Sequence, residues 1–141
     1  MLPDTLGVLT PEQVFASITD MRQRFPECRF DFHPHNDYGL GTANAMAAAR
    51  AGASTIHCTI NCLGERAGNA ALEEVVMTVQ TRQDVFQCST GLDTTQIMTC
   101  SRLVSGITGF TVQPNKAIVG ANAFAHESGI HQDGVLKSRE T

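Results

Sequence analysis

The sequence lacks the features that mark several large classes of protein. It has no tryptophan and a single tyrosine, and only 17% of its 141 residues are charged. Its 10 basic and 14 acidic side chains give a formal charge of −4, and lysine and arginine never cluster. Proteins that bind nucleic acid normally carry a clustered basic face, so we expect no nucleic-acid partner.

Long apolar runs and secretory features are missing as well. No run approaches the roughly 18–20 consecutive apolar residues that a membrane helix needs. The first residues do not combine a basic region with an apolar stretch, as a secretory signal does. The five cysteines are odd in number and scattered, and they form no CxxC pair. This usage is typical of reduced thiols. We therefore expect a soluble, cytoplasmic protein with no membrane partner.

What is present is enough apolar material for a packed core, at 42% of the residues. Three segments repeat apolar residues at helical spacing. The first has a clear start, with Thr10 as N-cap, Pro11 at the first helical position and Gln13 three residues after the cap. The sequence predicts helices over residues 11–25, 40–50 and 70–81, and a further helix over 93–105.

Two intervening segments, residues 28–35 and 54–61, alternate apolar and polar side chains as strands do. Strands that alternate with helices of this length indicate parallel βαβ units and an α/β fold. One face of each strand is apolar and the other is polar and carries histidine, which suits a (β/α)₈ TIM barrel. A complete barrel takes about 250 residues. We expect residues 1–85 to be the C-terminal portion of a barrel and residues 86–141 a mainly helical extension.

His33 and His35 are the most informative pair in the sequence. Residues two apart on a strand point the same way, so both imidazoles should face one cavity. Two imidazoles suit a borderline divalent cation, with oxygen ligands completing the site. The alternative is a pair of ordinary surface or core histidines.

Four further residues also have open interpretations. Asn69 stands in a polar, glycine-bearing loop before the helix over 70–81, where it could either cap that helix or bind a ligand. Thr5 follows a short segment that could be a strand, so its hydroxyl would lie at the same rim, or it is a simple turn residue. His126 and His131 could serve as general acid or base, or as polar surface.

Several segments, taken in order, carry a family resemblance over essentially the whole chain. They are residues 2–7 (LPDTLG), 33–40 (HPHNDYGL), 59–69 (TINCLGERAGN), 72–75 (LEEV), 113–120 (QPNKAIVG) and 124–137 (FAHESGIHQDGVLK). The sequence resembles the 2-isopropylmalate synthase family, which belongs with the homocitrate and citramalate synthases among metal-dependent Claisen-condensing barrels.

The resemblance implies a reaction and a set of roles. The expected reaction is the condensation of acetyl-CoA with 2-oxoisovalerate in leucine biosynthesis, aided by a divalent ion (Mn²⁺, Mg²⁺ or Zn²⁺). By resemblance, His33, His35 and Asn69 are at the metal, Thr5 and His33 contact the 2-oxo acid, and His131 is catalytic. The resemblance also implies a homodimer in which the segment after the barrel crosses into the partner's active site.

The departures from the family pattern are also specific. The Asp-Arg-Glu motif of the family's first strand is absent, so the resemblance implies roughly strands six to eight of the barrel and no turnover by the isolated chain. Cys62 stands where relatives usually have glycine, which matters if that backbone needs a positive φ. The alternatives are a citramalate synthase, which takes pyruvate, and a non-catalytic metal-binding or assembly half-barrel.

Overall fold

The computed structural model describes residues 1–123 and 125 of the chain. Three short parallel strands form one sheet in the order β1–β2–β3. These strands are β1 (Leu2–Asp4), β2 (Asp31–Pro34) and β3 (Thr55–Ile56). Each pair of neighbouring strands is connected through a helix, so the predicted α/β fold with parallel βαβ units is confirmed.

Helix α1 (Pro11–Arg24) begins as the sequence predicts. The Thr10 hydroxyl accepts a hydrogen bond from the Gln13 backbone N–H at 3.4 Å, while the Gln13 side chain accepts one from the Thr10 N–H at 2.9 Å. This reciprocal pair satisfies two backbone donors that the first turn of a helix leaves free.

The core lies between the sheet and its helices. Phe32 of β2 packs with Val14 and Ile18 of α1, with Ala47 and Ala48 of α2 (Gly41–Arg50), and with Ala51 just after α2. A second cluster joins α2 to α3 (Leu72–Thr81) through Ala45, Met46, Ala70, Val75 and Val79. The apolar face of the strands therefore meets the helices, as predicted, and the polar face is left for the site.

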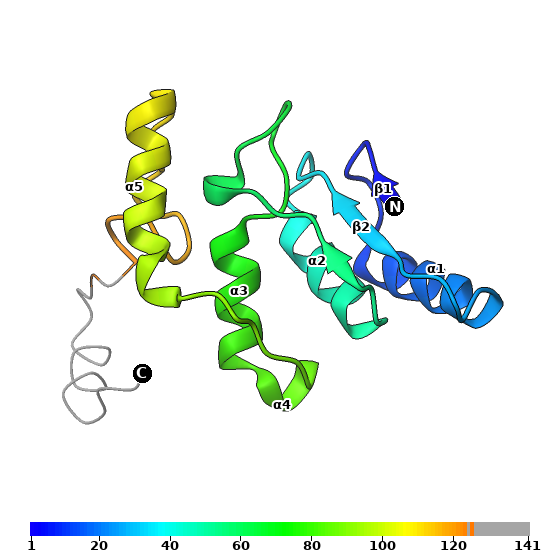
Figure 1. The fold of residues 1–141 in the computed structure, drawn as a ribbon. Coiled ribbons are helices and arrows are strands. Elements are labelled where there is room, and N and C mark those ends of the chain that lie inside the picture. Colours follow the sequence, from blue (N-terminus) through cyan, green and yellow to red (C-terminus); the bar gives the residue numbers. More distant parts are fainter. Residues whose placement is uncertain (124, 126–141) are drawn as a thin grey trace.

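The rest of the described chain is helical and irregular. It contains the 3₁₀ turns η1 (Ile60–Cys62) and η2 (Thr94–Gln96) and the helices α4 (Gln83–Phe86) and α5 (Ile97–Thr108). Helix α5 lies at the opposite end of the molecule from β1 and α1 (Figure 1). No helix in residues 1–123 is long and apolar enough to cross a membrane.

The predicted strands are longer than the observed ones. The segment expected to be extended over 54–61 is a strand only at Thr55–Ile56, and it runs into η1, where Asn61 has φ 59°. A backbone in the left-handed region cannot continue a strand. Alternation of side chains along 54–61 therefore overestimated the strand, and it did not detect the 3₁₀ turn at the end of the segment.

Candidate functional site

Three imidazoles meet where β2 and β3 end. The ring centroids of His33 and His35 are 5.1 Å apart, with the rings nearly perpendicular. His57, directly after β3, has its ring centroid 5.3 Å from that of His33, and the two Nδ1 atoms are 3.2 Å apart. The structure thus brings together the two histidines singled out from the sequence and adds a third that the sequence analysis did not propose.

Asn69 lies beside these histidines and does not cap a helix. The N-cap position of α3 is Ala71, and no side chain makes a capping hydrogen bond there. The Asn69 side chain is buried, and its Nδ2 lies 3.1 Å from the Pro34 carbonyl oxygen and 3.4 Å from Nε2 of His33. Of the two interpretations left open for Asn69, the geometry supports a place in the site.

Thr5 lies at the same edge of the sheet, just after β1. Its side chain is exposed, and its carbonyl oxygen accepts a hydrogen bond from Nη2 of Arg66 at 2.6 Å. The guanidinium of Arg66 also donates to both carboxylate oxygens of Asp37, at 2.7 and 3.1 Å. This two-point hydrogen bond joins the loops that follow β1, β2 and β3, and it lowers the pKa of Asp37.

The surroundings of His33 favour a neutral ring. Burial lowers the pKa of His33, and the nearby His35 and His57 lower it further. A neutral imidazole keeps one ring nitrogen unprotonated, and that lone pair is what a metal ion or a proton takes. His35 has a related feature, because its Nδ1 is buried without a hydrogen-bond partner among the described residues.

The donor atoms fit a divalent ion in part. His33 and His35 supply two neighbouring nitrogen ligands, the set that suits borderline cations. Within the described residues no group of three or more His, Cys, Asp or Glu side chains could hold a metal ion, so further oxygen ligands are needed. The side-chain oxygen of Asn69 lies against Gly64. It is so close that a side chain at position 64 would collide with it. His131, the predicted catalytic histidine, lies outside the described residues.

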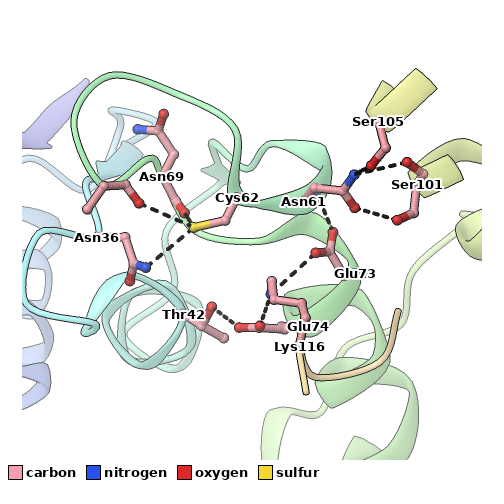
Figure 2. Close-up of polar contacts among 11 residues, drawn as sticks. Asn36, Thr42, Asn61, Cys62, Asn69, Glu73, Glu74, Ser101, Ser105 and Lys116 are labelled. Carbon is pink, nitrogen blue, oxygen red and sulfur yellow. Dashed lines mark hydrogen bonds and ion pairs between the residues drawn. The ribbon is translucent and has the colours of Figure 1, made fainter. Parts of the chain in front are cut away.

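A buried carboxylate organises the loop that carries Asn69. Glu73 on α3 is 1% exposed, and it accepts a hydrogen bond from the Asn61 backbone N–H at 3.1 Å. The side chain of Asn61 in turn bonds to Ser101 and Ser105 of α5. Figure 2 shows these contacts, which we call the Glu73 network: Asn61, Glu73, Ser101, Ser105 and Lys116.

Lys116 completes this network from a distant part of the chain. Its ammonium forms an ion pair with Glu74 and lies 3.4 Å from Glu73 Oε1, while Glu74 accepts a hydrogen bond from Thr42 at 2.6 Å. Burial by itself would lower the pKa of Lys116, but the two carboxylates raise it, so the amine stays charged. No local sequence pattern predicts that Lys116 pairs with Glu74, because the two residues are 42 positions apart in the sequence.

A cleft of 590 Å³ lies between the 61–69 loop and the C-terminal part of α5 with the residues that follow it. Asn36, Cys62 and Arg66 line one side, and Val104 and Phe110 line the other. The Cys62 thiol donates to the Asn69 carbonyl oxygen at 2.6 Å and accepts from the Asn36 side-chain amide at 3.4 Å (Figure 2). Cys62 has φ 63°, so this position does require the positive φ considered from the sequence.

Comparison with known proteins gives consistent matches. The sequence model of the HMGL-like family matches residues 1–104, and that of the homocitrate synthase post-HMGL domain-like family matches residues 118–141. The chain is 64% identical to a 2-isopropylmalate synthase of Nitrosomonas eutropha and 63% identical to one of Aromatoleum aromaticum. Both alignments cover 99% of this chain, which spans only 28% of the length of these curated relatives.

A solved structure supports the fold. An HMG-CoA lyase from Acenitobacter baumannii, in complex with coenzyme A and 3-methylmalate, matches with a TM-score of 0.70 at 27% sequence identity. The match covers 90% of this chain and 42% of the lyase chain.

Proposed function

Because this chain belongs to the HMGL-like family, we propose that it is a segment of a 2-isopropylmalate synthase. Such an enzyme removes a proton from the methyl group of acetyl-CoA, adds the resulting enolate to the ketone of 2-oxoisovalerate, and hydrolyses the thioester to release CoA. This is an acyl transfer in leucine biosynthesis. The identity of more than 60% to 2-isopropylmalate synthases over almost the whole chain supports the assignment.

The observation that carries the proposal is the group of imidazoles at the strand ends. In this proposal His33 and His35 hold a divalent ion, Mn²⁺, Mg²⁺ or Zn²⁺, and Asn69 is the third residue at the metal. When bound, the ion supplies Lewis-acid polarisation of the ketone of the 2-oxo acid. Thr5 and His33 contact the 2-oxo acid. The hydrogen bonds from Arg66 to Asp37 and to the Thr5 carbonyl oxygen fix the rim on which Thr5 lies.

His131 is proposed as a catalytic residue that passes a proton during enolate formation, since imidazole titrates near neutral pH. In an active enzyme that contains this chain, His131→Ala should lower kcat and leave metal affinity unchanged. Equal losses of metal affinity and kcat would contradict the role.

A homodimer is part of the same proposal. Leu103 and Ile107 of α5, with Phe110 just after it, are 60%, 76% and 70% exposed, a larger apolar surface than a lone helix normally leaves to water. We propose that the partner subunit covers this surface and that residues 86–141 cross to it. Sedimentation should show a dimer that Ile107→Glu converts to monomer. A monomeric wild-type chain would contradict the proposal.

The architecture of the whole enzyme follows from this assignment. We propose that β1, β2 and β3 are about strands six to eight of a TIM barrel. Residues 1–85 then belong to the barrel and residues 86–141 to the segment after it, in a cytoplasmic enzyme. The parallel order of the three strands and the placement of the histidines at their C-terminal ends support this proposal.

A chimaeric enzyme tests the proposed function. This chain replaces the matching segment of the Nitrosomonas eutropha synthase, and CoA release is measured with acetyl-CoA and 2-oxoisovalerate. We expect activity near that of the parent, and a loss of about a hundredfold or more in a His33→Ala/His35→Ala variant, the scale at which a misplaced substrate slows a reaction. Asp84→Asn, at an exposed position, is the control.

Two outcomes would overturn the assignment. A folded chimaera without any turnover would indicate a non-catalytic segment. A chimaera that prefers pyruvate to 2-oxoisovalerate would indicate a citramalate synthase.

A further inference from the structure

The contact between His33 and His57 is a hydrogen bond with one proton between the two rings. Their Nδ1 atoms are 3.2 Å apart, which is a hydrogen-bond distance. Two unprotonated nitrogens would repel each other, and two N–H groups would collide, so one ring donates and the other accepts. The contact therefore couples the tautomers of the two rings.

Asn69 decides which ring donates. Its Nδ2 lies 3.1 Å from the Pro34 carbonyl oxygen, which can only accept, so the NH₂ end of the amide must face that oxygen. The same Nδ2 lies 3.4 Å from Nε2 of His33. Since an amide NH₂ is a donor only, Nε2 of His33 must be the unprotonated nitrogen of that ring. Its proton is then on Nδ1, facing His57.

The backbone holds all three groups in this arrangement. The His57 N–H donates to the Phe32 carbonyl oxygen at 2.9 Å, which places His57 beside His33 on the neighbouring strand. Asn69 donates its N–H to the Cys62 carbonyl oxygen at 3.2 Å, and its own carbonyl oxygen accepts from the Cys62 thiol. The tautomers therefore follow from strand register and from a fixed loop.

We infer that His57 is a positioning residue for His33: it accepts the Nδ1–H of His33, and so keeps the Nε2 lone pair of His33 available to a metal ion. A histidine that binds a metal usually donates its other ring N–H to a fixed acceptor, which sets the tautomer and the ring orientation. Here the acceptor is a second imidazole, which carries its own proton on Nε2. The tautomer assignment stands on the contacts alone, whereas the role toward a metal rests on the proposed function.

The tautomer of His33 can be measured by nitrogen NMR on the 141-residue chain with isotope-labelled histidine. The pH is set above the range in which imidazole is charged. We expect His33 in the Nδ1–H form in the wild type. His57→Phe keeps a ring of similar size but has no acceptor, so His33 should become a mixture of tautomers. His57→Gln offers a carbonyl oxygen to the Nδ1–H and should restore the wild-type signal. A His33 spectrum that is the same in wild type and His57→Phe would overturn the inference.

Mn²⁺ binding to the same three proteins, followed by electron paramagnetic resonance, tests the role toward a metal. Loss of an outer partner of a metal-binding histidine typically costs about 10- to 100-fold in affinity, and we expect this loss in His57→Phe and recovery to within a few-fold in His57→Gln. Equal Mn²⁺ affinity in wild type and His57→Phe would overturn the positioning role. A wild-type chain that binds no Mn²⁺ would overturn the proposed metal site instead, while the NMR result still decides the tautomer.

Discussion

The first 56 residues and helix α5 are stabilised in different ways. The first part has a core in which Val14 and Ile18 are 1% exposed against Phe32 and the alanines of α2. In the later part, α5 has a single buried residue, Ser101, and it is joined to η1 by hydrogen bonds to Asn61. Apolar burial tolerates small shifts of its members, whereas a buried polar network must satisfy each of its groups. The two parts should therefore respond differently to substitution.

The largest loss of stability is expected from the core of the first part. Ile18→Ala removes a fully buried side chain between α1 and the sheet, and substitutions of this kind cost about 2–5 kcal/mol. Urea unfolding of the purified chain measures this loss. Ser17→Ala, one residue away on the exposed side of α1, is the control and should change the free energy of unfolding by less than about 0.5 kcal/mol. Similar values for the two variants would show that α1 does not pack as described.

The Glu73 network should give a smaller and more local effect. Glu73→Ala leaves the Asn61 N–H without its acceptor and removes one of the two carboxylates beside Lys116, which costs about 1–3 kcal/mol. Amide hydrogen exchange should become faster in α5 and unchanged in α1. Glu65→Gln, on a side chain that is 83% exposed, should alter neither helix. Uniformly faster exchange in both helices would mean that the two parts unfold as one unit.

The loop that bears Cys62 should respond to backbone conformation more than to side-chain chemistry. Cys62→Gly and Cys62→Ala both remove the thiol, but only glycine adopts φ 63° without strain. We expect Cys62→Gly to be more stable than Cys62→Ala by about 1 kcal/mol, the usual cost of a left-handed residue. Thermal unfolding of the two variants gives the difference directly. A more stable alanine variant would indicate that the loop relaxes to another conformation.

The smallest expected effect concerns the reactivity of the Cys58 thiol, which lies just after β3, and does not involve a change in stability. Burial, with a smaller contribution from the negative charge of Glu73, raises the pKa of Cys58 to about 11. At pH 9 only about one in a hundred Cys58 side chains is then a thiolate, the form that reacts. In the Cys28→Ser/Cys88→Ser variant, which lacks the two exposed thiols, modification of Cys58 should keep accelerating from pH 9 to 11. A rate that levels off near pH 9 would contradict the burial.

Local sequence patterns were sufficient for most of the fold. The capping residues before α1, the valine stripe of α3 and the alternation around Phe32 each depend on neighbours in the chain, and each predicted element is present. The prediction was wrong where a strand should have continued to residue 61. The strand ends at Ile56, and the chain then enters η1, where Asn61 has a positive φ that periodicity alone does not report.

The candidate site was only partly visible in the sequence. The spacing of His33 and His35 shows that they share a face, because side chains two apart on a strand point the same way. His57 lay on the polar face of the next predicted strand, but only the register of β2 and β3 shows that it reaches His33. The sequence allowed Asn69 either to cap the following helix or to lie at the site. Only its contacts with Pro34 and His33 show that it lies at the site.

By itself, the sequence determined the α/β class, the start of α1, the shared face of His33 and His35 and the family resemblance, because these depend on residue type and short spacing. Tertiary structure alone decided that His57 shares a proton with His33, that Arg66 binds Asp37, and that Glu73 joins Asn61 and Lys116. These pairs are 12 to 43 residues apart. Only strand register and helix packing, which a local pattern does not contain, bring their atoms within a few ångströms.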